Sequence, residues 1–301
     1  TKFLNKLEKI MRSDTKKDIK IGVIGKGFVG TAVSHGFSHQ TGFGAQIKIY
    51  DKNPAKSQNS LQDTVNDSDF IFLSVPTPSF PDGSIDLSIV DDALSSIDAV
   101  NKNKSNIILL RSTVVPGTTQ FYQDKYPNLR FVFNPEFLTE RSASFDFINQ
   151  TRVILGGTKK NTELVKKLYK ERFGDYIPVV ETNFETAELI KYMNNLFFAT
   201  KVSFLNEMKL VADKVNVNWD EAVNGFILDG RIGHSHLSVP GPDGKFGFGG
   251  SCFPKDIQAL IKFANDIGVK MNVLEGAWKT NLKVRPEKDW EKLKGRAVSE
   301  E

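Results

Sequence analysis

The glycine-rich turn at residues 25–30 constrains the fold of this chain more than any other feature. An apolar run at residues 19–24 predicts a buried strand before the turn, and small residues predict a helix after it. A second strand, expected at residues 46–50, ends at Asp51. Glycines in this order permit a tight turn and close approach of a pyrophosphate, and an acid about 20 residues later accepts hydrogen bonds from ribose hydroxyls. The pattern predicts a doubly wound parallel α/β sheet that binds a dinucleotide, with a turn that binds no ligand as the alternative.

The residue at the ribose position also indicates which dinucleotide is bound. The carboxylate of Asp51 favours NAD over NADP, because a 2′-phosphate would meet a negative charge. Lys52 and Lys56 weaken this preference slightly. The residues expected around NAD in this part of the chain are Gly25, Gly27, Phe28, Val29, Gly30, Asp51 and Lys56.

Further apolar runs predict more strands of the same sheet, at residues 70–75, 107–110, 131–133 and 152–155. Three of them are followed by small or polar residues, at positions 76–79, 111–113 and 134–136. Ligands of open parallel sheets bind at the carboxyl ends of the strands, so these three endings are expected to line one cleft. Thr113 and Glu136 are therefore functional candidates, and helix capping is the alternative role for either.

A long helix is expected from Phe184 to Val215, where no proline or glycine interrupts the apolar pattern. Its apolar residues cover more than one stripe, which indicates burial on two sides and a subunit interface. Lys191 and Asn195 are four residues apart and share one face of this helix. They could point together into the cleft or form an ordinary solvated pair.

The single cysteine, Cys252, lies between Gly249 and Asp256, just ahead of another predicted helix. The unsatisfied N–H groups of a helix N-terminus and a nearby cation both favour a thiolate. Pro254 suits the first helical position, and glycines such as Gly250 would let a substrate approach the backbone. This layout is typical of an activated thiol, and a buried, inert cysteine is the alternative.

Composition narrows the class of protein. One cysteine excludes an intramolecular disulfide, and the four scattered histidines offer no cluster of metal ligands, so no metal is expected. The chain has no run of 18 apolar residues and no signal-peptide pattern, so we expect a cytoplasmic protein without a membrane partner. Residues 1–20 carry seven Lys or Arg against three acids, which accounts for the whole net charge of +4. A nucleic-acid partner is therefore not expected.

These observations predict four segments. They are a basic N-terminal extension at 1–18, an NAD-binding Rossmann domain at 19–181, a mainly α-helical catalytic and dimerisation domain with one long central helix at 182–283, and a charged C-terminal tail at 284–301.

Six motifs in register, between about Ile19 and Ala264, resemble the UDP-glucose/GDP-mannose dehydrogenase family. They are the turn at Gly25 to Gly30, Ser112 to Val114, Asn134 to Leu138, Lys191 with Asn195, Arg231, and Gly249 to Asp256. The resemblance implies oxidation of a sugar 6-hydroxymethyl group to a carboxylate with two NAD⁺. Cys252 would trap the aldehyde as a thiohemiacetal, and a second oxidation would give a thioester that water hydrolyses.

The resemblance also implies residue roles. Asp256 and Lys191 would act as a base through an ordered water, and Lys191 and Asn195 would stabilise oxyanions. Glu136 would assist thioester hydrolysis, and Thr113 would position water or cofactor. Further cofactor contacts are expected at Val75, Pro76, Thr77, Ser112, Thr113, Glu140 and Lys255. Substrate contacts are expected at Glu136, Phe137, Leu138, Lys191, Asn195, Phe248, Gly249 and Arg231, the last reaching across a homodimer formed through the long helix.

Two departures from the family leave alternatives open. Members usually continue into a second Rossmann-like domain for the nucleotide, and the 22 residues after Lys279 are too few for it. We therefore expect a short form that holds the nucleotide with a loop at 239–245, a separate chain that supplies this function, or a smaller substrate. Many members also have Asn before Thr where this chain has Pro76, a change expected to affect only cofactor packing.

UDP-glucose is the expected substrate, with GDP-mannose and a UDP-N-acetylhexosamine as alternatives. Two other classes stay open. A two-electron β-hydroxyacid or 6-phosphogluconate-type dehydrogenase also joins a Rossmann domain to a long helix, but needs no cysteine, so Cys252 argues against it. A non-catalytic, cofactor-bound subunit is the second, and the joint presence of Cys252, Lys191, Asn195, Asp256 and Glu136 argues against it.

Overall fold

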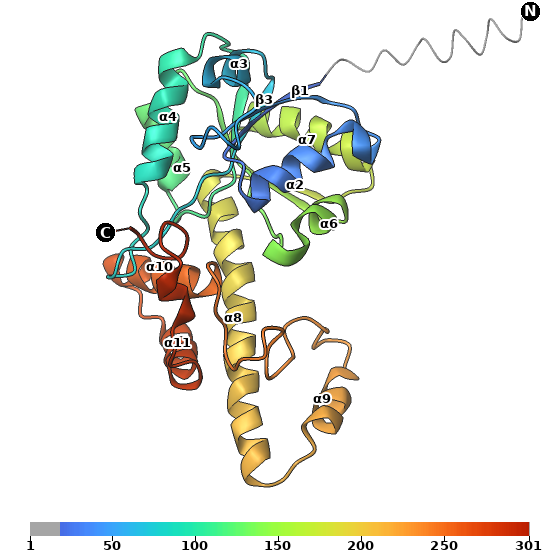
Figure 1. Cartoon of the computed structure of the whole chain (residues 1–301), viewed down its shortest axis with the longest axis vertical. Helices are drawn as coiled ribbons and strands as arrows, with labels where there is room; N and C mark the ends of the chain where they lie inside the picture. Colours follow the sequence, from blue (N-terminus) through green and yellow to red (C-terminus); the bar gives the residue numbers. More distant parts are fainter. Residues whose placement is uncertain (1–18, 301) are drawn as a thin grey trace, which may run out of the picture. The chain divides into compact units, whose positions relative to one another are not determined.

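The computed structural model describes residues 19–300, which form two compact units (Figure 1). The first unit contains residues 19–75, 93–112 and 119–184, and the second contains 76–92, 113–118 and 185–300. The extension predicted at 1–18 lies outside the described residues. No helix in the described part of the chain is both long and apolar enough to span a membrane.

The first unit is built on a seven-stranded sheet with the order β2-β1-β3-β4-β5-β6-β7. The strands are β1 Lys20–Ile24, β2 Gln46–Tyr50, β3 Phe70–Leu73, β4 Ile107–Leu110, β5 Phe131–Phe133, β6 Val153–Gly156 and β7 Val179–Thr182. From β1 the chain passes to β2 on one side and then crosses to β3 on the other. The predicted doubly wound fold class is confirmed, and the reversal of strand order puts the ligand crevice of such a fold beside the end of β1.

The far end of the sheet differs from the predicted parallel arrangement. The strands β1 to β5 pair in parallel, whereas β5 and β6 are antiparallel through Phe133 and Gly156. An antiparallel neighbour needs no long crossover, which suits a connection that contains only the 3-10 turn η2 (Glu140–Ser142) and the six-residue helix α6 (Ala143–Ile148). Strand β7 was not predicted, because its Glu181 and Thr182 give it no buried apolar run.

Helices cover both faces of this sheet (Figure 1). The helical segments are α2 Phe28–Gly36, η1 His39–Thr41, α3 Leu61–Asn66, α4 Ser88–Val100, α5 Thr118–Lys125, η2 Glu140–Ser142, α6 Ala143–Ile148 and α7 Lys159–Phe173. One face is covered by α2, α6 and α7, whose apolar side chains form a core with Ile21 and Val23. On the other face α3 approaches Gly22, where an added Cβ would lie 2.8 Å from the carbonyl oxygen of Thr64.

The second unit is helical. Its elements are nearly all of α8 Phe184–Lys214, α9 Trp219–Ile227, α10 Phe253–Asp266, α11 Asn272–Val284 and η3 Asp289–Lys292. The predicted long helix is present and ends one residue before Val215. Tyr192 and Leu196 on α8 pack in one apolar cluster with Ile257 on α10 and Ala277 on α11. This core holds α8, which carries the predicted Lys191 and Asn195, against α10, which carries the predicted Asp256.

The segment after α11, predicted as a charged tail, makes ordered contacts within the second unit. Trp290 is buried and its ring centroid lies 5.3 Å from that of Trp278. The Ser79 N–H donates to the carbonyl oxygen of Ala297 at 3.1 Å, and the Ser299 N–H donates to that of Ser79 at 2.8 Å. The residues near the C-terminus therefore hold the loop that begins at residue 76. The domain boundaries drawn from the sequence stay a prediction.

Candidate active site

Two of the three glycines in the turn after β1 are required by close packing. Gly25 has a φ of +90°, and a Cβ there would lie 2.4 Å from the carbonyl oxygen of Ser74. A Cβ on Gly30 would lie 2.0 Å from the carbonyl oxygen of Gly25. Gly27 differs, because a Cβ there would meet nothing within 4 Å. The open side of the turn is therefore at its second glycine.

The N-terminus of α2 and the nearby Asp51 fit a dinucleotide. Gly27 is the N-cap of this nine-residue helix, and no side chain caps it. A helix N-terminus with free N–H groups binds phosphate oxygens. Asp51 follows β2 and accepts hydrogen bonds from the backbone N–H of Lys26 at 2.6 Å and of Asn53 at 2.8 Å. The acid is thus fixed beside the turn, where a ribose next to the pyrophosphate would lie.

A cavity of about 400 Å³ lies next to this turn in the first unit. It is lined by Phe28, Thr31, Glu140, Arg141, Ser142, Ala143, Ser144 and Phe145. Two predicted cofactor residues, Phe28 and Glu140, are 112 positions apart in the sequence and line it together.

The ends of β3, β4 and β5 are tied by polar contacts. The Ser112 hydroxyl donates to the Val75 carbonyl oxygen at 2.7 Å. Arg111, which follows β4, donates from Nη1 to Oδ1 of Asn134, which follows β5, at 2.6 Å. The Tyr169 hydroxyl on α7 donates to the same oxygen at 2.5 Å. Burial raises the pKa of Tyr169, which keeps the phenol as a donor. Sequence reasoning missed Tyr169, because nothing local distinguishes it from a core aromatic residue of α7.

The residues after β5 have neighbours inside the first unit. Glu136 is buried and its Oε2 accepts a hydrogen bond from the Leu138 N–H at 2.7 Å. The Arg152 guanidinium lies 4.2 Å from the ring centroid of Phe137, and Leu138 packs against the core of the sheet. Of these three predicted substrate residues, only Glu136 holds a charged group.

Two loops of the second unit bring predicted cofactor residues together. The Thr77 hydroxyl donates to the Thr113 carbonyl oxygen at 2.9 Å. The Gly117 N–H donates to Oε2 of Glu188, a fully buried residue of α8, at 2.7 Å. Glu188 thereby ties the loop that contains Thr113 to the long helix.

Asp256 is the centre of a buried polar cluster in the second unit. It is 1% exposed, and each carboxylate oxygen has its own donor. Asn195 Nδ2 donates to Oδ2 at 2.7 Å, and Lys255 Nζ donates to Oδ1 at 2.6 Å. Lys191, one helical turn before Asn195 on α8, is 3% exposed. The predicted Lys191 and Asn195 are thus buried rather than solvated, and Asn195 meets Asp256 across 61 residues of sequence.

Cys252 lies at the N-terminus of α10. It is the N-cap of that helix, its side chain is partly exposed, and its carbonyl oxygen accepts the Asp256 N–H at 2.9 Å. The Ser251 hydroxyl oxygen lies 3.8 Å from its sulfur. The helix begins at Phe253, so Pro254 occupies the second helical position rather than the predicted first. Both positions precede the first N–H that the helix itself must bond, so proline fits either.

A buried phenol that sequence reasoning missed adjoins this cluster. Tyr192 lies between Lys191 and Asn195 in sequence, and its pKa is raised well above the ordinary value, first by burial and then by the charges of Asp256 and Glu188. Its hydroxyl has no hydrogen-bond partner among the described residues. The phenol therefore stays protonated beside two carboxylates.

Three other predicted substrate residues have local partners. Phe248 is buried, with ring centroids of Phe253 and Trp278 at 6.0 and 6.2 Å. Gly249 lies so close to the Arg285 guanidinium that a Cβ would be 2.5 Å from Nη2. Arg231 is 90% exposed and pairs with Asp229 at 2.5 Å.

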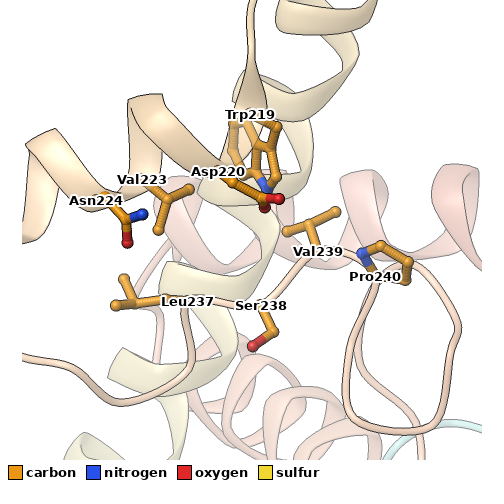
Figure 2. A pocket seen from close by; sticks show the side chains of 8 residues that line it. All are labelled: Trp219, Asp220, Val223, Asn224, Leu237, Ser238, Val239 and Pro240. Carbon is orange, nitrogen blue, oxygen red and sulfur yellow. The ribbon is translucent and has the colours of Figure 1, made fainter.

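A second cavity, of about 530 Å³, lies between α9 and the chain at residues 237–240 (Figure 2). Its lining is Trp219, Asp220, Val223, Asn224, Leu237, Ser238, Val239 and Pro240. The last two begin the loop at 239–245 that was predicted to grip a nucleotide. The charged residues of that loop have other partners, because Asp243 pairs with Arg285 at 2.6 Å and Lys245 with Glu287 at 3.3 Å.

Comparison with known proteins places these two units in one family. Residues 51–173 match the NAD binding domain of the UDP-glucose/GDP-mannose dehydrogenase family, and residues 185–283 match its central domain. NAD is therefore the dinucleotide that the first unit binds.

Individual relatives agree with these matches. A UDP-glucose 6-dehydrogenase of Rickettsia prowazekii is 38% identical over 77% of this chain and 53% of its own length. One of Haloferax volcanii is 31% identical over 87% of this chain and 69% of its own. A solved UDP-glucose dehydrogenase from Pyrobaculum islandicum matches with a TM-score of 0.76 at 27% identity, over 90% of this chain and 69% of that one.

The chain spans about half the length of the first of these relatives. The two domain matches nevertheless cover residues 51–173 and 185–283, and the solved relative shares the fold. The chain belongs to the UDP-glucose/GDP-mannose dehydrogenase family.

Proposed function

We propose that the protein is an NAD-dependent nucleotide-sugar 6-dehydrogenase that converts the 6-hydroxymethyl group of UDP-glucose to a carboxylate. The observation that carries the proposal is the Asp256 cluster, which joins Asn195, Lys255 and Asp256 one helical turn from Cys252. The cluster holds a carboxylate, an ammonium and an amide at the first turn of the helix that Cys252 caps, and proton transfer and oxyanion stabilisation require groups of these kinds.

The residues of the cluster can carry both oxidations. NAD, when bound, accepts a hydride from the sugar carbon in each of them. In the first oxidation Asp256 and Lys191, acting through a water, take the hydroxyl proton, which leaves an aldehyde. The Cys252 sulfur then bonds to the aldehyde carbon, and the oxygen takes up a proton to give a thiohemiacetal. Loss of that proton and a second hydride gives the thioester.

Hydrolysis completes the reaction. Water adds to the thioester carbon, the carbon–sulfur bond breaks, and Cys252 regains its thiol as the carboxylate leaves. The Lys191 ammonium and the Asn195 amide stabilise the negative oxygen that forms in this step. Glu136 accepts a proton from the attacking water, and Thr113 positions water or cofactor.

Four alternatives differ in substrate or chemistry. GDP-mannose and a UDP-N-acetylhexosamine have the same 6-hydroxymethyl group, so the cluster suits them equally. A two-electron dehydrogenase forms no covalent intermediate, so its reaction does not require the partly exposed thiol at a helix N-terminus. A non-catalytic subunit transfers no proton, so it does not require the buried Asp256 cluster. We therefore favour the four-electron reaction over the last two.

We further propose that the protein is a homodimer formed through α8. One face of this helix exposes large apolar side chains in the single chain, among them Met193, Phe197, Phe204 and Val211. A second copy of the helix would cover this face, since exposed apolar patches of this kind mark interaction sites. Arg231, exposed beyond α9, is the residue proposed to reach the partner's substrate. A cytoplasmic location stays a prediction.

The count of NADH formed per sugar tests the reaction. With limiting UDP-glucose and excess NAD⁺, we expect two NADH per sugar and UDP-glucuronate as product. One NADH per sugar would support the two-electron alternative. No turnover with any of the three nucleotide sugars would contradict the proposal.

The variant Cys252→Ala tests whether the thiol is needed for the reaction but not for NADH binding. We expect the variant to bind NADH as tightly as the wild type and to lose carboxylate formation by at least about a thousandfold, because no thioester can form. Fluorescence titration and product analysis provide the two measurements. Sustained carboxylate production by this variant would exclude the thioester mechanism.

A further inference from the structure

The segment from Asp243 to Cys252, here called the cysteine loop, is held by side chains of other elements. It lies between α9 and α10 and belongs to no helix or strand. The Gly247 N–H donates to Asn206 Oδ1 on α8 at 2.9 Å, and the Phe248 N–H donates to Asn281 Oδ1 on α11 at 2.7 Å. The conformation of the loop just before Cys252 therefore depends on these distant amides.

Asn281 holds both backbone groups of one residue. Besides accepting the Phe248 N–H, it donates from Nδ2 to the Phe248 carbonyl oxygen at 3.0 Å. It is fully buried. A buried amide with both ends paired to one residue fixes position and orientation, and replacing it would leave buried backbone groups unpaired.

Arg285 supports the same loop from the C-terminal end of α11. Its side chain is 2% exposed. Nη2 donates to Asp243 Oδ2 at 2.6 Å, and Nη1 donates to the Phe246 carbonyl oxygen at 3.3 Å. A Cβ on Gly249 would lie 2.5 Å from Nη2, so only glycine allows the loop to lie this close to the guanidinium.

The charge of Arg285 is fully neutralised where it lies. Asp243 takes one hydrogen bond from it, and Asp289 takes one from Nε at 2.7 Å and one from Nη2 at 3.0 Å. Two carboxylates on one buried guanidinium leave no net positive charge to stabilise a thiolate nearby. Arg285 can therefore affect Cys252 by fixing the position of the cysteine loop, and not through the electrostatic field of its guanidinium.

We propose that Asn281 and Arg285 are positioning residues that hold the cysteine loop so that the Cys252 sulfur stays at the N-terminus of α10. Neither residue was predicted from the sequence as part of the site. Displacement of a reacting group by about 1 Å can cost about a hundredfold in rate, so a loop fixed at four points before the nucleophile matters for chemistry. The effect on turnover rests on the proposed function; the effect on the thiol does not.

Alkylation of the thiol tests the proposal directly. Cys252 is the only cysteine of the chain, so mass spectrometry of the full chain treated with iodoacetamide reports this sulfur alone. We expect Arg285→Lys, which keeps the charge but loses the planar fork, to slow alkylation at neutral pH by about tenfold. Gly249→Ala, which pushes the loop away from an intact Arg285, should have the same effect.

The control is Lys262→Met, which breaks the exposed pair with Asp266 on α10 without touching the loop. It should be alkylated like the wild type.

In turnover, the two loop variants should lose about tenfold or more in kcat with little change in the KM for NAD, because the cofactor residues are unaltered. A general loss of stability would not lower kcat while leaving the KM for NAD unchanged in the protein that stays folded.

The proposal would be overturned if folded Arg285→Lys or Gly249→Ala protein were alkylated at the wild-type rate. In the wild type alone, amide hydrogen exchange at Gly247 and Phe248 should be as slow as in α10, and fast exchange there would also overturn it. If the wild type shows no dehydrogenase activity but the loop variants still alter alkylation, the proposed function fails and the positioning role stands.

Discussion

At the scale of single residues, the pairing of Asp256 shows how a buried charge is tolerated beside a reactive group. Its side chain and that of Lys255 are 1% and 8% exposed, and their closest N and O atoms are 2.6 Å apart. The second oxygen receives the Asn195 amide. Burying one of these charges without its partner would cost free energy, so removing either residue should destabilise the whole cluster.

Asp256→Ala should therefore destabilise the fold as well as impair catalysis. Lys255 would be left buried without its counter-charge, and we expect the free energy of unfolding to fall by about 3–5 kcal/mol. The matched control is Asp266→Ala on the same helix, which removes an exposed pair with Lys262 and should cost less than about 1 kcal/mol. Denaturant titration measures both. Equal losses in the two variants would contradict this account of the cluster.

The turn after β1 allows cofactor binding and folding to be tested separately. Gly27→Ala adds a Cβ that meets nothing within 4 Å, so the fold should tolerate it, but a pyrophosphate at the α2 N-terminus would be pushed away. We expect NADH to bind about tenfold more weakly or worse, a loss of about 1.4 kcal/mol, with little change in Tm.

Gly30→Ala is the contrasting variant, because its Cβ would lie 2.0 Å from a backbone oxygen. It should lower Tm by several degrees, since backbone on one side or the other must shift. Fluorescence titration with NADH and thermal unfolding distinguish the two effects. Wild-type NADH affinity in Gly27→Ala would argue against a pyrophosphate at this turn.

At the scale of elements, α8 carries two apolar faces with different neighbours. Tyr192 and Leu196 are buried against α10 and α11, whereas Met193 and Phe197, each one position later, are 63% and 64% exposed. The sequence predicted burial on both sides. A single chain buries one face, and the other is what the proposed dimer would cover.

If the proposed dimer forms through α8, Phe197→Glu should therefore shift it to monomers. A charge placed in a covered apolar interface has no partner there and must be desolvated. Val273→Glu on α11, at a residue that is 71% exposed, is the control and should leave the association state unchanged. Sedimentation velocity at several concentrations measures it. A wild type that is monomeric throughout, or a Phe197→Glu protein that still dimerises, would contradict the proposed interface.

At the scale of the whole molecule, the second unit is assembled from parts of the chain that lie far apart in sequence. Residues 76–92, 113–118 and 185–300 fold together. Ser79 pairs with the backbone at residues 297–299, and Arg285 joins Asp243 to Asp289. The stability of this unit therefore depends on contacts made by the last residues described.

The Arg285 pairs should make stability fall in acid. The hydrogen bonds from Arg285 hold the pKa of Asp289 below its ordinary value, against the opposing effect of burial. A carboxyl whose pKa is lowered by folding stabilises the native state above its unfolded pKa of about 3.9, and this is lost as pH falls through the folded value. Asp289→Asn should be less stable than the wild type at pH 7 and should lose less stability between pH 5 and 2. Denaturant titrations across this range measure the difference, and parallel curves would contradict it.

The sequence alone determined the features that are set locally. Turn chemistry at Gly25 to Gly30, strand periodicity and the uninterrupted pattern of α8 each depend on neighbouring residues, so they could be predicted without a structure. The helix start after Cys252 belongs to the same group. The family resemblance rested on these same short motifs, which is why the fold class was recovered while the roles of single residues stay proposals.

Only the tertiary structure decided which distant groups meet. Asn195 reaches Asp256 across 61 residues, and Asn281 reaches Phe248 across 33. The reversed direction of β6 and the contact between Arg285 and Gly249 depend likewise on how elements pack. No local pattern encodes such contacts, because a polar residue on a helix is equally suited to solvent or to a buried partner until packing places that partner beside it.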